Sequence, residues 1–180
     1  MLNFDMQIID LVNKIQFPLL DKIMIFFTSL GNAGIIWIVI GIVLVLRKET
    51  RQLGVLLLTA LFITAALGEG ILKNLIKRER PFEIVNSLKL LIPAPISYSF
   101  PSGHTASSFT AFGVFYFMNF RYKWCVLILA SLIAFSRIYL NVHWTTDIIG
   151  GILLGLTVSY ITCKVFVERR VVESVDEDVF

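Results

Sequence analysis

The two histidines of this chain are the residues from which a chemical function can be argued. His143 stands four residues before Asp147, so the two side chains lie on one face of a helix that begins there. A carboxylate in that place can hydrogen-bond one ring nitrogen, fix the tautomer, and leave the other nitrogen free and more basic. Such an arrangement makes a nucleophile or a base, although an isolated pair is more typical of a structural helix cap.

The second histidine ends the segment Pro101-Ser102-Gly103-His104, which directly precedes an apolar run. Proline and serine are common where a helix begins, and Ser102 is predicted to be the N-cap. Gly103 lets a ligand come close to the backbone. Because a helix N-terminus offers free N–H groups and a positive dipole end, this segment suits an anion such as phosphate, with His104 beside it. The alternative is a plain helix cap with an incidental histidine.

Basic residues gather on the N-terminal side of both histidine segments. Lys73, Lys77 and Arg80 stand at i, i+4 and i+7, which predicts three cations on one helical face. Glu69 is four residues before Lys73 and can pair with it. Pro81 disfavours helix at Arg80 and is expected to end the helix there. Read alone, this face is more typical of a collar that binds lipid headgroups.

The elements that must position these residues are predicted to lie in a membrane. Of the 180 residues, 57% are hydrophobic and only 16% are charged, and the mean hydropathy is +0.81. A soluble domain has about 25% charged residues, so a soluble enzyme is excluded and one integral-membrane domain over residues 1–180 is expected. The net charge of +3 is too weak and too scattered to indicate a nucleic-acid partner, and the two cysteines form no metal-binding pair.

The fold class predicted from the apolar runs is all-α, a polytopic bundle of transmembrane helices. A span needs about 20 residues, with a range of about 17–25. Five runs are predicted to be spans, although the first is short: 31–46, 53–76, 104–120, 124–140 and 146–167. Residues 1–30 are amphipathic and form either interfacial helices or a broken sixth crossing. In the last span Gly151 and Gly155 form a small-xxx-small step that allows close helix packing. Residues 171–180 are predicted to be an acidic tail.

The distribution of lysine and arginine predicts the orientation in the membrane. The connectors 47–52 and 119–123, together with residues 168–170, are basic and fall on one side by alternation. By the positive-inside rule that side is cytoplasmic. Both histidines and the cation cluster therefore face the extracytoplasmic side, and no purely structural interpretation explains why they gather there.

These three segments together resemble the signature of the type 2 phosphatidic-acid phosphatase family, the integral-membrane lipid phosphate phosphatases. That signature is K-x6-RP, PSGH and SR-x5-H-x3-D. This chain matches its order and spacing without departure, with the residues Lys73, Arg80-Pro81, Pro101-Ser102-Gly103-His104, Ser136-Arg137, His143 and Asp147.

The resemblance implies a role for each matching residue. His143 is the expected nucleophile, which becomes a phosphohistidine, and Asp147 orients it. His104 is the expected general acid, which then activates the hydrolytic water. The remaining motif residues are expected to bind phosphate: Lys73, Arg80, Ser102, Gly103 and Arg137. Lys77 and Arg78 fall outside the family pattern and are assigned no catalytic role.

Fixed cations and N–H groups can neutralise a phosphoryl group without a metal, and no acidic cluster suited to Mg²⁺ accompanies the motifs. Metal-independent hydrolysis without a cofactor is therefore expected. The predicted partner is a lipid phosphate in the bacterial cytoplasmic (inner) membrane. The resemblance to short bacterial members favours undecaprenyl diphosphate, with phosphatidylglycerophosphate or phosphatidic acid as alternatives. A lipid-headgroup-binding or lipid-moving protein is the non-enzymatic alternative, and the oligomeric state does not follow from the sequence.

Overall fold

The computed structural model describes residues 2–177, with side chains over residues 3–168, and throughout the described part the chain is helical without strands. This agrees with the predicted all-α class. The acidic tail predicted over residues 171–180 lies outside the residues whose side chains are described. The elements are α1 (Leu2–Asn13), α2 (Pro18–Leu30), η1 (Asn32–Gly34), α3 (Ile35–Leu46), η2 (Lys48–Thr50), α4 (Arg51–Ala65), η3 (Ala66–Leu72), α5 (Lys73–Ile76), α6 (Pro81–Ile84), α7 (Gly103–Phe117), α8 (Lys123–Tyr139) and α9 (Thr145–Glu177).

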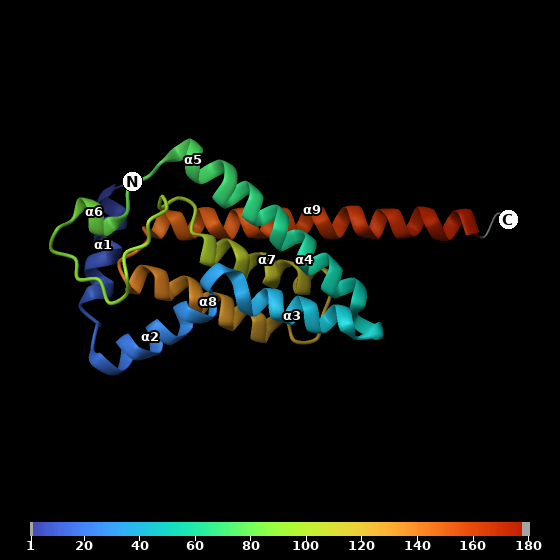
Figure 1. Ribbon diagram of the computed structural model, residues 1–180, viewed down its shortest axis with the longest axis horizontal. Helices are drawn as coiled ribbons and strands as arrows, with labels where there is room; N and C mark the ends of the chain where they lie inside the picture. Colours follow the sequence, from blue (N-terminus) through green and yellow to red (C-terminus); the bar gives the residue numbers. More distant parts are fainter. Residues whose placement is uncertain (1, 178–180) are drawn as a thin grey trace.

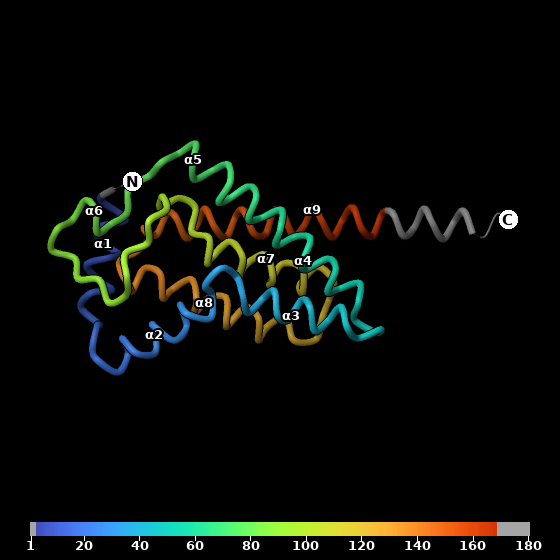
Figure 2. Tube along the Cα trace, viewed as in Figure 1, coloured from blue at the N-terminus to red at the C-terminus, as the bar shows by residue number. Residues whose placement is uncertain are grey.

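The bundle is arranged around α7, which packs most extensively against α9 and also contacts α8 and α4 (Figure 1). The chain trace shows α1, α6 and the connector before α7 together at one end, while the α3–α4 and α7–α8 connectors lie toward the other (Figure 2). The large apolar side chains Leu46 and Phe62 are each 75% exposed. An outward apolar surface of this kind is what a lipid environment requires.

The close contact between α7 and α9 depends on the predicted glycine step. A Cβ atom on Gly155 would lie 2.5 Å from the carbonyl oxygen of Ala106 and 2.7 Å from the amide nitrogen of Thr110. A Cβ atom on Gly151 would lie 2.9 Å from the carbonyl oxygen of Ser102. Only a residue without a side chain allows backbones to approach this closely, so the predicted packing role of both glycines is confirmed.

Two stretches of helix, Lys48–Ile84 and Thr145–Glu168, are long and apolar enough to cross a membrane. The pair Pro18–Leu30 and Asn32–Leu46, bent by 44°, is a third if the two form one broken span. The predicted five spans are therefore not all reproduced, because α7 and α8 have only 15 and 17 residues.

The N-terminal third differs in detail from the prediction. The first predicted span, 31–46, becomes helical α3 only at Ile35, because Ala33 and Gly34 adopt positive φ angles of 50° and 67°. Residues 18–30 form a helix that continues into α3 through this bend. Helix α1 is separate and packs on α8 and α9, with Ile9 fully buried.

The segment that leads to the first motif is irregular. Helix α4 passes into a π-helical turn over Ala66–Leu72 before α5 begins at Lys73. Turns of this kind are rare and occur frequently at functional sites. The connector after α6 is only partly buried: Leu90 and Ile92 pack against the buried core, whereas Ile96 is fully exposed.

Candidate active site

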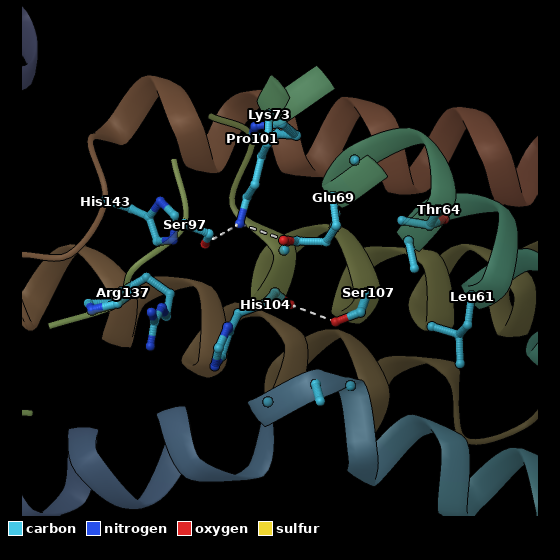
Figure 3. A pocket seen from close by; sticks show the side chains of 18 of the residues that line it. Leu61, Thr64, Glu69, Lys73, Ser97, Pro101, His104, Ser107, Arg137 and His143 are labelled. Atoms are coloured by element: carbon cyan, nitrogen blue, oxygen red, sulfur yellow. Dashed lines mark hydrogen bonds and ion pairs between the residues drawn. The ribbon is translucent and has the colours of Figure 1, made fainter. Parts of the chain in front are cut away.

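A cavity of about 700 Å³ brings the three motif segments together. Figure 3 shows the side chains of His104, Arg137 and His143 around it, with Lys73 reaching in from the opposite side. The predicted site residues that line it are Lys73, Arg80, Gly103, His104, Arg137 and His143. Ser102 and Asp147 are fully buried outside the cavity lining.

His143 lies in the connector between α8 and α9 and is 2% exposed. Its Nε2 is 3.3 Å from Nη1 of Arg80. A guanidinium can only donate, so Nε2 presents its lone pair and a neutral ring carries its proton on Nδ1. Burial, and then the positive charges of Arg137, Arg80 and Lys73, hold the pKa of His143 well below its usual value. The ring is therefore a neutral imidazole with an available lone pair beside the cavity.

Asp147 is held by more partners than the sequence suggested. Its Oδ2 accepts hydrogen bonds from Ser99 Oγ at 2.5 Å and from the backbone N–H of Trp144 at 2.9 Å, and its Oδ1 accepts from Arg78 Nη1 at 2.6 Å. The His143 Nδ1 to Oδ2 distance is longer, 3.4 Å. The bond to Trp144 is also a helix cap, so this carboxylate both caps α9 and faces the imidazole.

The cations do not lie on one helical face, and this expectation was wrong. Helix α5 ends at Ile76, and Lys77 adopts a left-handed conformation with φ 49°. The chain then turns back, so that Arg80 and Lys73 both donate to the Ser97 hydroxyl, at 3.2 and 3.0 Å. Lys77 is exposed and does not line the cavity. Pro81 begins the short helix α6 instead of ending the long one.

Arg80 is fixed by backbone carbonyl groups of two connectors. Its Nε donates to the carbonyl oxygen of Ser97 at 2.7 Å, and its Nη1 donates to that of Val142 at 2.6 Å. The Nη2 atom donates to the carbonyl oxygen of Tyr98 at 3.2 Å. These contacts fix the guanidinium beside the His143 ring with little freedom to rotate.

Lys73 and Arg137 are also buried but are less fully paired. Lys73 is 5% exposed, and its Nζ lies 2.8 Å from Glu69 Oε1 and 3.0 Å from Ser97 Oγ. The predicted pairing with Glu69 is thus confirmed. Arg137 is 4% exposed and donates to Thr28 Oγ1, while its Nε has no hydrogen-bond partner within residues 3–168. A buried guanidinium with an unused donor is costly, so an anion bound in this cavity would stabilise it.

At the start of α7, Ser102 is the predicted N-cap: its Oγ accepts the backbone N–H of Thr105 at 3.5 Å. Its own N–H donates to the carbonyl oxygen of Asp147 at 3.2 Å. Ser102 is fully buried and does not line the cavity, and its expected contact with phosphate stays a prediction. Gly103 does line the cavity, and a Cβ atom there would collide with Glu69 Oε1.

His104 is held by the break between α2 and α3. Its Nε2 lies 3.1 Å from Asn32 Oδ1, and a Cβ atom on Gly31 would come within 2.7 Å of the His104 ring. Asn32, like Ser99 and Arg78, was not singled out from the sequence. Asn32 lies far from any motif, while Ser99 and Arg78 stand two residues before Pro101 and Arg80, and that adjacency was the only available signal.

Within the described residues no group of three or more His, Cys, Asp or Glu side chains could hold a metal ion. The charge of the cavity is instead carried by fixed cations. Arranged around an imidazole lone pair, they can bind and neutralise a phosphoryl group.

Comparison with known proteins gives consistent matches. Residues 53–170 match the model of the PAP2 superfamily. The undecaprenyl-diphosphatase of Sulfolobus acidocaldarius is 33% identical over 165 residues, which cover 91% of this chain and 79% of that protein. The lipid A 4'-phosphatase of Porphyromonas gingivalis is 32% identical over 173 residues, covering 88% and 71%. The crystal structure of a transmembrane PAP2-type phosphatidylglycerolphosphate phosphatase from Bacillus subtilis superposes with a TM-score of 0.75 at 30% identity, covering 93% of this chain and 86% of that one.

Proposed function

This chain belongs to the PAP2 superfamily of lipid phosphate hydrolases, and we propose that it releases phosphate from a membrane lipid through a phosphohistidine formed on His143. The observation that carries the proposal is the position of Arg80 Nη1, 3.3 Å from His143 Nε2. It makes Nε2 the unprotonated nitrogen and places that nitrogen beside a cation, where the phosphoryl oxygens of a substrate would be bound.

In the first step, the Nε2 lone pair attacks phosphorus and the bond from phosphorus to the leaving oxygen breaks. His104 supplies the proton that the leaving oxygen takes up. In the second step water attacks the phosphohistidine, His104 accepts the proton of that water, and inorganic phosphate and free His143 are formed. One imidazole cannot be nucleophile and acid in the same step, which gives each histidine a separate task.

The other site residues support these two steps. Lys73, Arg80 and Arg137 neutralise the oxygens of the transferred group, together with the N–H of Gly103. Asp147 keeps the His143 proton on Nδ1 and stabilises the positive charge that the ring develops. Ser102 acts through its cap on α7. No step needs a metal or a cofactor.

The shape of the cavity supports an amphiphilic substrate. From the cations it continues along apolar side chains of α3 and α4, among them Ile38, Leu58 and Phe62. A headgroup can bind at the His143 end while a hydrocarbon chain follows these helices. Undecaprenyl diphosphate is the favoured substrate, because the Sulfolobus acidocaldarius relative named for it aligns with 91% of this chain. Phosphatidylglycerophosphate is the second candidate, supported by the similar Bacillus subtilis structure, and phosphatidic acid remains a third.

The proposed setting is the inner membrane of a bacterium, with one domain over residues 1–180, five spans and the site on the extracytoplasmic face. In support of this orientation, the basic α3–α4 and α7–α8 connectors lie toward the end of the bundle away from α1 and α6 (Figure 1). The positive-inside rule places such connectors in the cytoplasm.

Phosphate release from lipid phosphates in detergent, with a chelator present, tests the function. Wild-type protein is expected to remain active in chelator and to carry radiolabel from ³²P-labelled substrate after an alkaline quench, which preserves phosphohistidine. The His143→Gln variant should lose both turnover and label while it still binds lipid. Wild-type turnover in His143→Gln would refute the nucleophile, and lipid binding without any turnover in the wild-type protein would favour the headgroup-binding alternative.

A further inference from the structure

We propose that Arg78 is a positioning residue for Asp147 and that Asp5 holds Arg78 in place. The N-terminal helix α1, which carries Asp5, therefore supports the active site. The inference rests on the proposed function, in which Asp147 orients the nucleophile. Neither Arg78 nor Asp5 belongs to the signature segments, and neither lines the cavity.

The guanidinium of Arg78 joins two buried carboxylates. Its Nη1 lies 2.6 Å from Asp147 Oδ1, and its Nη2 lies 2.8 Å from Asp5 Oδ2. Both carboxylates have no solvent exposure, whereas the Arg78 side chain is 22% exposed. A rigid, planar fork can hold two carboxylates at a fixed separation, which a single ammonium group on a flexible chain does less well.

Asp5 is itself anchored to the first turn of α9. Its Oδ1 accepts the backbone N–H of Thr146 at 2.9 Å, and its Oδ2 accepts the Thr146 hydroxyl at 2.7 Å. The Arg78 guanidinium also stands 5.5 Å from the centre of the Trp144 ring. Helix α1 is thus attached to the N-terminus of α9 at the residue next to Asp147.

These contacts determine which oxygen of Asp147 faces the nucleophile. Arg78 occupies Oδ1, so Oδ2 remains for Ser99, for the Trp144 N–H and for His143 Nδ1. The contact to His143 is the longest of the set, at 3.4 Å, so it depends on the others to hold the carboxylate in place. Without Arg78, two buried carboxylates would also face each other without a cation, which is strongly unfavourable.

The geometry predicts an effect on turnover and none on phosphate binding, because Arg78 does not reach the cavity. The kcat of Arg78→Gln should fall on the order of tenfold to a hundredfold, as for other groups that orient a functional side chain through a hydrogen bond without contacting the substrate. The KM and the inhibition constant of inorganic phosphate, which stays tetrahedral and reports only on the binding of the anion, should stay within about twofold of wild type. Asp5→Asn should show a smaller loss of the same kind.

The experiment uses the full chain in detergent with one double variant and four single variants: Arg78→Gln, Arg78→Lys, Asp5→Asn and the control Lys77→Gln. Lys77 is the neighbouring cation, is exposed, and lies outside the cavity lining, so its replacement should leave kcat unchanged. Arg78→Lys should recover part of the turnover. The double variant Arg78→Gln/Asp5→Asn should be no slower than Arg78→Gln, because both changes break one network.

Wild-type kcat in Arg78→Gln would overturn the inference, and so would an inhibition constant of inorganic phosphate that weakens in step with kcat, since Arg78 would then be a phosphate ligand. If Arg78→Gln does not fold, Asp5→Asn decides the matter: an unchanged kcat in that variant overturns the inference. The proposed function fails separately, through wild-type turnover in His143→Gln.

Discussion

Replacing Glu69 with glutamine tests whether its carboxylate occupies the place that a substrate phosphate takes. Glu69 Oε1 lies 2.8 Å from Lys73 Nζ and so close to Gly103 that a side chain on the glycine would collide with it. The carboxylate is therefore an anion beside a buried lysine at the N-terminus of α7, where an anion is expected to bind. A phosphate that binds there must displace it.

The size of the effect follows from the exposure of the pair. The Lys73 side chain is 6% exposed, but that of Glu69 is 48% exposed, so solvent screens much of the attraction. Pairs of this kind contribute up to about 1 kcal/mol, and about 0.5–1 kcal/mol is a reasonable cost of displacing the carboxylate. Since 1.4 kcal/mol corresponds to a factor of ten, vanadate and inorganic phosphate should bind about twofold to fivefold more tightly to Glu69→Gln.

The assay is inhibition of lipid phosphate hydrolysis by vanadate and by inorganic phosphate. Glu79→Gln is the matched control, because Glu79 is exposed and does not line the cavity. Weaker inhibition of Glu69→Gln than of wild type would refute the reasoning and would show that Glu69 positions Lys73 for substrate. An equal gain in inhibitor affinity in Glu79→Gln would show that the effect arises from the change in net charge and not from the position of Glu69.

Three further predictions concern the histidines and the helix packing. In His104→Gln, His143 is the only imidazole of the chain. Nitrogen NMR should show this ring neutral at pH 6 with its proton on Nδ1, because its lowered pKa keeps it unprotonated to a lower pH than free imidazole. A protonated ring at pH 6 would contradict this. The kcat of His104→Ala should fall more on a lipid monophosphate than on a lipid diphosphate, whose leaving group is a weaker base, and equal losses would contradict the general-acid role. Gly155→Ala should lower the Tm by several degrees because its Cβ would meet the backbone of α7, whereas Gly70→Ala, with open space around it, should not; thermal unfolding in detergent distinguishes them.

The sequence predicted which residues gather at the site better than it predicted the helices that carry them. The motif spacing led to His143, His104 and the cations, and the structure brings these side chains to one cavity. The placement of Lys73 and Arg80 on one helical face was wrong, because helical periodicity was extended past a residue, Lys77, that adopts a left-handed conformation. Periodicity identifies a helical face only while the helix continues, and the sequence holds no signal that the helix ends at this lysine.

The residues that support the site could not be found by local reasoning. Arg78 contacts Asp5, 73 positions away, and His104 contacts Asn32, 72 positions away. Such contacts depend on how helices pack, which a single sequence does not specify. The number of spans was overestimated for another reason: α7 and α8 are apolar, but with 15 and 17 residues they are shorter than the about 20 residues that a span needs.

The π-helical turn over Ala66–Leu72 changes the direction in which Lys73 points relative to the long helix α4. A π turn takes in one more residue than an α turn, so deletion of one residue there would restore regular winding and rotate everything beyond it by about 100°. All the signature residues would keep their types and spacing, but the Lys73 ammonium would point away from the proposed position of the phosphate. An intact signature is therefore insufficient evidence of a competent enzyme in any homologue whose preceding helix lacks that additional residue.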